Sequence, residues 1–439
     1  MAEDADFEAK AGDFLCQFER ILESDLLIDE IGFIHPSQFS KLKEEAGGSK
    51  SATSEIMGYD SSDFLLQDHK LGVSTEILHP LYIAARNTFM AATRKYRSFC
   101  NQDDQTVAGN HLSELSNSFN IVESEVMKHS RALLLLSCDF GTAWNSRKFI
   151  LSKKQHLSMY LDELLLSKLV LSYFPKSEQA WCHRRWVIKL LVQKGYTVEE
   201  ILKKESELVE RIAEMSKMNY RAWNHRCWLV SYMSREQVLN EVKKTRKWAA
   251  LHVADNCCFH YRRRLMLKIL EDITCTEISS GLSVDIYQMW KEELDWDEML
   301  IKRYVGREAL WIHRRFLSAC WMIHFVTDPN TREQEGEISN NFHFFLENEL
   351  NLVNSCSFIP NDDFEDFQAQ ATYSGAYLLW LIKNCPKPNM IQLDEKLKAC
   401  NLKTLLYKRW FGEKIGRFVV DLKHDIDRDH HKDARSIQV

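Results

Sequence analysis

The segment PKSEQAWCHRRW, at residues 175–186, decides the fold, because similar segments return along the chain. In each copy an aromatic residue is followed three positions later by an arginine. The copies are FGTAWNSRKF (140–149), PKSEQAWCHRRW (175–186), NYRAWNHRCW (219–228), DNCCFHYRRR (255–264) and REALWIHRRF (307–316), and their aromatic residues lie 37, 42, 36 and 52 residues apart. A period of about 40 residues is typical of helical hairpins stacked side by side.

The residues before the second copy show how one hairpin is built. Apolar residues recur at steps of three and four between Gln155 and Tyr173, which predicts a helix with one wide apolar face. Pro175 ends this helix, and Ser177 is a suitable N-cap for the next one. Glu178 then lies in the first turn, where its negative charge suits the helix dipole. Neither helix covers its own apolar face, so neighbouring hairpins must stack.

Composition supports an all-α fold. The chain has 439 residues but only 7 prolines and 15 glycines, too few to supply the frequent turns of a sandwich or barrel. We therefore predict an α-solenoid, a superhelical array of helical hairpins. The predicted regions are a partly mobile N-terminal region with short helices (1–75), the hairpin array (76–325), a helical C-terminal extension (326–422) and a charged tail (423–439).

Outside the repeats, several helices and one loop are expected. Loop signals between Ile273 and Ser283 place the extra length of the fourth interval there. The N-terminal region contains an amphipathic stretch from Phe14 to Ile28. Further helices are predicted over 78–96, 112–137, 338–352, 364–382 and 394–410.

Charge and hydropathy exclude several classes of protein. The net charge is −6, so no basic excess points to a nucleic-acid partner. The first ten residues, MAEDADFEAK, lack the features of a signal peptide, and no apolar run is long enough to span a membrane. The 12 cysteines are scattered without a CxxC pair, as expected of reduced thiols. These features predict a cytoplasmic protein.

Residues three positions apart lie on one face of a helix, so each repeat places its aromatic ring beside its arginine. The favoured interpretation is structural: the ring fills the space between hairpins, while the arginine stacks on it or binds a carboxylate of the next unit. A ladder of arginines that reads RNA is the alternative. The pairs are Trp144 with Arg147, Trp181 with Arg184, Trp223 with Arg226, Phe259 with Arg262, and Trp311 with Arg314.

Three histidines precede the arginine of their repeat: His183, His225 and His313. Equivalent residues of stacked hairpins lie about 10 Å apart, whereas ligands of one zinc ion lie within about 2.3 Å of it. We therefore predict half-buried structural histidines and assign no metal to this chain.

The pattern W-x-H-R-x-W, preceded by Pro-Lys-Ser or Asn-Tyr, resembles the repeat of protein prenyltransferase α subunits. The resemblance runs from about Asp139 to Leu317. It implies a right-handed superhelical crescent wrapped around a separate β subunit, which would hold the zinc and most of the isoprenoid pocket. The fourth repeat departs most, because Phe259 replaces tryptophan.

The resemblance also implies site residues. In the family, a lysine five residues before the second-repeat tryptophan reaches the isoprenoid diphosphate, and here that position is Lys176, which would stabilise the leaving diphosphate. Glu178 stands where the family usually has tyrosine, which is a departure. The substrate-binding residues carried over are Gln179, Asn219, Tyr220 and Arg221.

Three functional classes follow. The first is the non-zinc subunit of a heterodimeric prenyltransferase, active only with a β subunit. The detail of the repeats is most similar to the Rab-type enzyme, which implies geranylgeranyl diphosphate, a Rab-type β subunit and a protein substrate with a C-terminal cysteine. The second is a catalytically silent adaptor on the same scaffold. The third is a tetratricopeptide-like or RNA-associated repeat protein, although a strict 34-residue period is absent.

Overall fold

The computed structural model describes residues 2–45, 63–103, 112–275, 280–325, 335–358, 365–385, 393 and 395–397. Its contacts group the chain into two compact units, Met1–Ser234 and Arg235–Val439, each of which is described by itself. The boundary falls between the third and fourth repeats, within the range that the sequence treats as one array.

The first unit begins with a helix and a small sheet. Strand order in the sheet is β1-β3-β2; β3 pairs parallel with β1 and antiparallel with β2. Asp68 and His69, with φ values of 48° and 61°, form the turn between β2 and β3. The elements are α1 (Ala2–Ser24), β1 (Glu30–Ile34), α2 (Pro36–Glu45), β2 (Phe64–Gln67) and β3 (Lys70–Ser74).

This N-terminal region contains more regular secondary structure than the sequence predicts. Helix α1 has 23 residues, longer than the expected stretch from Phe14 to Ile28, and the strands were not predicted. The sheet lies against the end of the repeat helix α7 (Leu157–Tyr173), where the Ile31 amide donates to the Ser172 hydroxyl at 3.3 Å. The ring of Phe33 packs edge-on against Tyr173 at 4.5 Å. Contacts with a distant helix therefore hold strands that are too short to be recognised in sequence.

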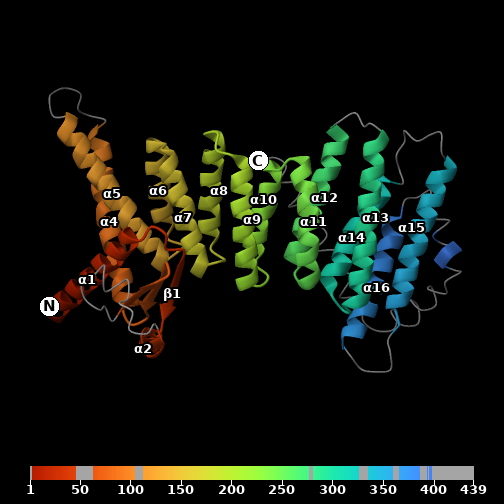
Figure 1. Cartoon of the computed structure of the whole chain (residues 1–439), viewed down its shortest axis with the longest axis horizontal. Helices are drawn as coiled ribbons and strands as arrows, with labels where there is room; N and C mark the ends of the chain where they lie inside the picture. Colours follow the sequence, from red (N-terminus) through yellow and green to blue (C-terminus); the bar gives the residue numbers. More distant parts are fainter. Residues whose placement is uncertain are drawn as a thin grey trace. The chain divides into compact units, whose positions relative to one another are not determined.

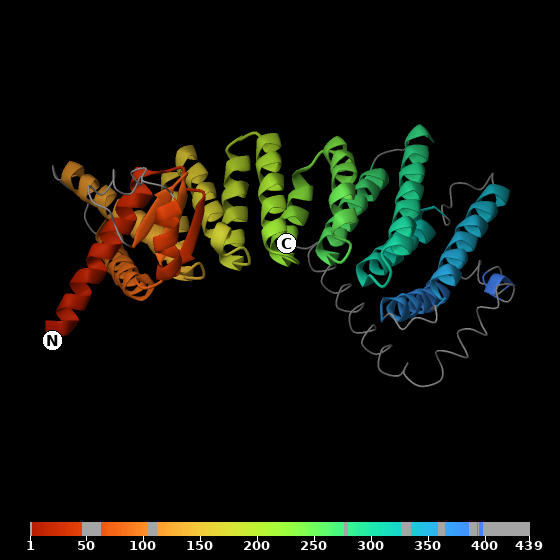
Figure 2. The ribbon, with the colours of Figure 1, turned by 60° about the horizontal axis from the view of Figure 1, so that its bottom comes forward.

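The remainder of the first unit is a row of antiparallel helices (Figures 1 and 2). Four consecutive pairs pack together: α4 with α5, α5 with α6, α7 with α8, and α9 with α10. Helix α8 also contacts both α6 and α10. The helices are α4 (Leu78–Asp103), α5 (Leu112–Leu136), α6 (Gly141–Lys154), α7, α8 (Glu178–Gln193), α9 (Val198–Met215) and α10 (Tyr220–Leu229), followed by the short 3₁₀ helix η1 (Val230–Tyr232).

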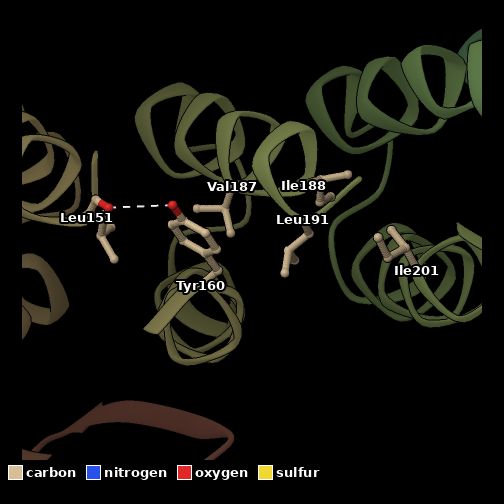
Figure 3. Packing of buried hydrophobic residues seen from close by; sticks show 6 residues of the cluster. All are labelled: Leu151, Tyr160, Val187, Ile188, Leu191 and Ile201. Carbon is tan, nitrogen blue, oxygen red and sulfur yellow. Dashed lines mark hydrogen bonds between the residues drawn. The ribbon is translucent and has the colours of Figure 1, made fainter. Parts of the chain in front are cut away.

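Apolar residues from four helices form a continuous core between these hairpins (Figure 3). Tyr160 of α7 and Ile201 of α9 pack with Val187 and Leu191 of α8, and Leu151 of α6 closes the cluster. All are at least 96% buried, and each aliphatic side chain contributes roughly 1.5–3 kcal/mol through burial. The stacking predicted from the apolar faces is therefore confirmed.

The second unit repeats the hairpin pattern. Helices α11 with α12, α13 with α14 and α15 with α16 form the hairpins, and α12, α14 and α16 pack in that order. The bounds are α11 (Arg235–Leu251), α12 (Asn256–Cys275), α13 (Ser280–Arg303), α14 (Glu308–His324), α15 (Glu335–Cys356) and α16 (Glu365–Asn384).

The expected loop from Ile273 to Ser283 is largely helical, because α12 continues to Cys275 and α13 begins at Ser280. The long repeat interval therefore comes mainly from longer helices. The helices predicted over 338–352 and 364–382 correspond to α15 and α16. The predicted helix at 394–410 lies outside the described residues except for 395–397, and the charged tail lies wholly outside them.

Two loop residues fix how hairpins begin. Ser177 is the N-cap of α8, as predicted, and its hydroxyl accepts the Ala180 amide at 3.3 Å. Gly306 precedes α14 with φ 75°, and a Cβ there would lie 2.7 Å from the Asp366 carbonyl oxygen. Only glycine fits that approach. The all-α fold predicted from the repeats is confirmed.

Candidate functional site

Four of the five repeat arginines are buried and form an ion pair with a glutamate of the next hairpin. Arg184 of α8 binds both oxygens of Glu205 in α9, at 2.6 and 2.7 Å. Its remaining nitrogen donates backwards to the Leu164 carbonyl and the Ser167 hydroxyl of α7, at 2.6 and 2.9 Å. One guanidinium thus joins three consecutive helices, using the fork geometry that lysine lacks.

The same arrangement recurs at three more arginines. Each binds a glutamate of the following hairpin and a carbonyl 20 residues before itself. The sets are Arg147 with Glu163 and Met127, Arg262 with Glu293 and Val242, and Arg314 with Glu349 and Leu294. Arg226 differs, because it donates to Ser206 and Glu210 at 2.6 and 2.9 Å.

Three of the four glutamates, Glu163, Glu205 and Glu293, also bind the histidine that precedes the next arginine. His225 Nε2 lies 2.8 Å from Glu205, and His183 Nε2 lies 2.8 Å from Glu163. The histidine rings also pack against the preceding tryptophans, His183 on Trp144 at 4.5 Å and His225 on Trp181 at 4.8 Å. Histidine, glutamate and arginine therefore form one rung between neighbouring hairpins. We call the series of rungs the buried ladder.

Electrostatics within the ladder fix its protonation states. Burial alone would raise the pKa of Glu205, but Arg184 and His225 lower it to about 2. Burial lowers the pKa of His225, although Glu205 opposes the shift. Among the described residues, Nδ1 of this histidine has no hydrogen-bond partner, so the neutral ring donates from Nε2 to a charged carboxylate.

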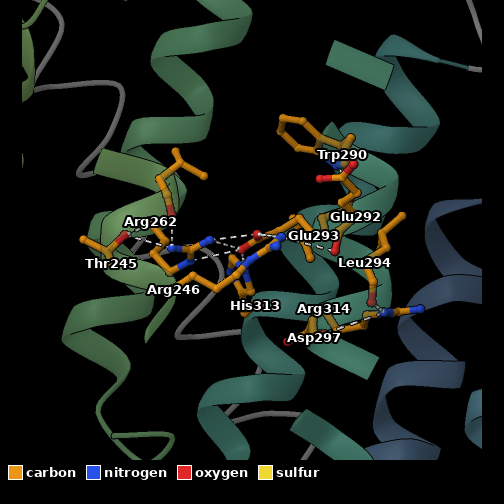
Figure 4. A network of polar contacts seen from close by, with 12 residues as sticks. Thr245, Arg246, Arg262, Trp290, Glu292, Glu293, Leu294, Asp297, His313 and Arg314 are labelled. Carbon is orange, nitrogen blue, oxygen red and sulfur yellow. Dashed lines mark hydrogen bonds and ion pairs between the residues drawn. The ribbon is translucent and has the colours of Figure 1, made fainter. Parts of the chain in front are cut away.

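Figure 4 shows the rung of Arg262, Glu293 and His313 in the second unit, where the ladder also changes chemistry. Tyr261 stands where histidine occurs elsewhere and donates to Glu241 at 2.8 Å. His313 lies 3.2 Å from Glu293, and burial lowers its pKa to about 4 despite that contact. Near the end of the series, Tyr377 donates to Glu349 at 2.6 Å. A phenol therefore replaces the imidazole where the sequence departs from the repeat.

Asp297, beside Arg314, departs from the pattern of the other rungs. It lies 17 residues before Arg314, where Ser130, Ser167 and Thr245 accept from the other arginines. Its carboxyl is fully buried, 3.8 Å from Arg314 and without a hydrogen bond among the described residues. Burial raises the pKa of Asp297 well above its usual value; Arg314 opposes the rise, and the carboxylates of Glu293, Glu349 and Glu298 add to it.

We expect Asp297→Asn to stabilise the protein increasingly as pH rises above about 4. The unfolded chain ionises this carboxyl near pH 3.8, whereas the folded chain ionises it at a higher pH, so wild type loses stability as pH rises between these two points, by up to about 1.4 kcal/mol per unit. Thermal unfolding between pH 4 and 8 measures the difference. Asp295→Asn, at an exposed position on the same helix, is the control, and parallel profiles for wild type and Asp297→Asn would contradict the assignment.

Besides the buried ladder, the second candidate site is the row of loops that precede α6, α8 and α10, which we call the loop edge. Ser177 donates to Asp139 at 3.0 Å, and Asn219 donates to the Pro175 carbonyl at 2.9 Å. Trp181 donates to the same carbonyl at 3.0 Å. These contacts hold the three loops side by side.

Residues expected at a substrate site fall into two groups along this edge. Lys176 and Gln179 are exposed, and Tyr220 has 62% of its surface exposed. Lys176 has no hydrogen bond or ion pair with any described residue. Asn219 is fully buried; besides its bond to Pro175, its side chain accepts the Ala222 amide at 3.2 Å as the N-cap of α10. Asn219 therefore positions the loop rather than facing solvent.

The Arg221 side chain is half-buried and forms an ion pair with Glu178, which also accepts from Arg185 at 2.9 Å. Sequence reasoning treated Arg221 as a candidate contact, and Glu178 as an acid in the first turn of its helix and a departure from the family. It did not foresee that the two bind each other across neighbouring hairpins.

The ladder glutamates were also missed. The sequence does contain a usable signal. In four repeats the histidine or tyrosine just before the arginine is itself preceded, 20 residues earlier, by a glutamate. The pairs are Glu163 with His183, Glu205 with His225, Glu241 with Tyr261, and Glu293 with His313. In the described part of the chain, no group of three or more His, Cys, Asp or Glu residues is arranged to hold a metal ion. None of the described helices combines the length and apolarity needed to cross a bilayer.

Comparisons with known proteins agree with the hairpin geometry. Residues 160–191 and 202–233, which cover α7–α8 and α9–α10, match the protein prenyltransferase alpha subunit repeat. Protein prenyltransferase alpha subunit repeat-containing protein 1 of Homo sapiens is 28% identical over 306 residues, covering 59% of this chain and 69% of that protein. Its Danio rerio counterpart is 30% identical over 228 residues, covering 43% and 53%.

A more distant similarity reaches a named transferase subunit. The geranylgeranyl transferase type-2 subunit alpha of Saccharomyces cerevisiae is 23% identical over 267 residues, covering 60% of each chain. The chain thus spans between about half and two thirds of the length of these relatives. The two matched repeats form stacked hairpins of the first unit, and this part of the chain is therefore similar to the repeats of protein prenyltransferase alpha subunits.

Proposed function

We propose that this chain is the non-zinc subunit of a heterodimeric protein prenyltransferase, active only with a β subunit. The observation that carries the proposal is Lys176. It lies at the loop edge, one residue before the N-cap of α8, exposed and without an ion-pair partner among the described residues. An unpaired ammonium beside a helix N-terminus suits an anionic group brought by a partner.

The reaction proposed is geranylgeranyl transfer from geranylgeranyl diphosphate to a C-terminal cysteine of a protein. A bond forms between the cysteine sulfur and the first carbon of the isoprenoid, while the bond from that carbon to the diphosphate oxygen breaks. The electron pair leaves with the diphosphate. Lys176 would stabilise the charge that develops there, and exposed Tyr220 and Gln179 would line the same edge.

The partner would contribute the remaining chemistry. Zinc held by a β subunit would favour the thiolate form of the substrate cysteine. A Rab-type β subunit is our choice, because a relative carries the name geranylgeranyl transferase type-2 subunit alpha. We place the assembled enzyme in the cytoplasm.

A second candidate is a catalytically silent adaptor that binds a β subunit or another protein through the same scaffold. The observation that favours it is Glu178, which pairs with Arg221 two residues after Lys176. This carboxylate lowers the positive charge available to a diphosphate at the loop edge.

Coexpression tests both candidates. The chain is produced with a Rab-type β subunit and, in parallel, with the β subunits of other prenyltransferases, and each mixture is assayed for a 1:1 complex and for isoprenoid transfer to a cysteine-bearing protein. We expect a complex and transfer with the Rab-type partner. A complex without transfer would favour the adaptor, and no complex with any β subunit would rule out the enzyme subunit.

A further inference from the structure

Three charged side chains meet beside the start of α8, and a fourth belongs to Lys176, two positions before Glu178. Glu178 is bound by Arg185 from its own helix and by Arg221 from α10, while Lys176, in the loop just before, has no ion-pair partner in the described part of the chain. Glu178 and Arg221 have 43% and 41% of their side chains exposed, and Arg185 has 18%. The pairs are therefore open to solvent and to a ligand.

Both carboxylate oxygens of Glu178 are in use. Oε1 accepts from Arg185 at 2.9 Å and from the Cys182 thiol at 3.1 Å, and Oε2 accepts from Arg221. Two guanidinium groups on one carboxylate form the kind of clamp that binds phosphate oxygens in other proteins. In this protein the anion held by the two guanidinium groups is the Glu178 carboxylate.

We infer that Glu178 is a built-in competitor for anions at the loop edge: a diphosphate that reaches Lys176 must displace this carboxylate from Arg221 to gain that arginine. The inference deepens the proposed function, on which the role of Lys176 rests. It assigns Arg221 and Arg185 to diphosphate binding and makes Glu178 the residue that limits the affinity.

The net charge of the four side chains supports this competition. Three cations and one carboxylate leave the cluster with a charge of +2, which neutralising Glu178 would raise to +3 while freeing both guanidinium groups. Burial alone would raise the pKa of Glu178, but hydrogen bonds from Cys182 and Arg185, the charge of Arg185 and the bond from Arg221 lower it. The carboxylate therefore remains ionised at neutral pH and competes there.

Titration of the full-length chain with inorganic diphosphate, followed by calorimetry, tests the inference without a β subunit. We expect Glu178→Gln to bind about tenfold more tightly than wild type, which corresponds to about 1.4 kcal/mol. Glu199→Gln is the matched control, because Glu199 is an exposed acid in the first turn of α9. Its affinity should equal that of wild type.

A second variant and a double mutant separate competition from altered folding. Glu178→Tyr removes the charge without leaving an amide, and it should also bind more tightly. In an Arg221→Gln background, the gain from Glu178→Gln should shrink to less than about threefold, because the displaced arginine is gone. Circular dichroism and melting temperature check that each variant is folded.

The outcomes are distinguishable from those of the proposed function. If Glu178→Gln and Glu178→Tyr fold but bind diphosphate no more tightly than wild type, the inference is wrong even when a β complex transfers isoprenoid. A gain that persists in full without Arg221 would also overturn it. If the gain in affinity appears and depends on Arg221 but no β subunit binds, the inference that Glu178 competes with anions is supported and the prenyltransferase proposal fails.

Discussion

Replacing Glu205 with leucine is expected to lower the free energy of unfolding by about 3–5 kcal/mol, the usual cost of removing one partner from a buried ion pair. Glu205 is 99% buried and accepts from both Arg184 and His225. Without it, two nitrogens of Arg184 lose their acceptor in a site that excludes water. Urea unfolding followed by far-ultraviolet circular dichroism measures the loss.

The control comes from the same helix. Glu207→Leu, at an exposed position of α9, should change stability by no more than about 0.5 kcal/mol. Adding Arg184→Met to Glu205→Leu should restore at least half of the loss, because the unpaired buried charge is then gone as well. Equal effects at Glu205 and Glu207 would show that the ladder does not hold the hairpins together.

Destabilisation on acidification should follow from the same rungs. The folded pKa of Glu205, about 2, lies below its unfolded value of 4.5, so the stability that it contributes is present above pH 4.5 and is lost as pH falls toward 2. For His313 the folded pKa of about 4 lies below 6.5, so stability declines between pH 6.5 and 4. Glu205 and His313 therefore act in the same direction, whereas Asp297 acts in the opposite one.

The repeat residues carried enough information to predict the hairpins but not the ladder. Trp181 and Arg184 lie on one turn, so a local pattern shows them together. The partner of Arg184 is Glu205, 21 residues away, whereas Arg147 and Glu163 are 16 apart and Arg314 and Glu349 are 35 apart. Because hairpin lengths vary, the distance from an arginine to the glutamate that binds it is not fixed, and only the 20-residue spacing from a glutamate to the following histidine or tyrosine recurs.

The N-terminal sheet was beyond prediction for a different reason. Strand β1 has five residues, and it is held by the Ser172 hydroxyl and the ring of Tyr173, which are about 140 residues away in sequence. Local propensity does not contain such contacts. At the loop edge, likewise, sequence placed Lys176 in a turn but gave no sign that Glu178 reaches Arg221 across 43 residues.

Lys176→Ala is expected to lower isoprenoid transfer by the assembled heterodimer at least tenfold, a loss of about 1.4 kcal/mol of transition-state stabilisation or more. The negative charge on the departing diphosphate is greatest in the transition state, so an ammonium beside it should lower kcat more than it affects KM. Lys176 is exposed and packs into no core, so the substitution should leave folding intact. Single-turnover transfer with a Rab-type β subunit measures the change.

Lys176→Arg and Lys203→Ala provide the comparison. Arginine keeps the positive charge and should retain most of the activity, whereas Lys203 is an exposed lysine of α9 whose loss should have no effect. Gel filtration of each variant with the β subunit shows whether assembly is preserved. If Lys176→Ala assembles and turns over as wild type does, Lys176 does not belong to the site, and the diphosphate must be bound by the partner alone or through Arg185 and Arg221.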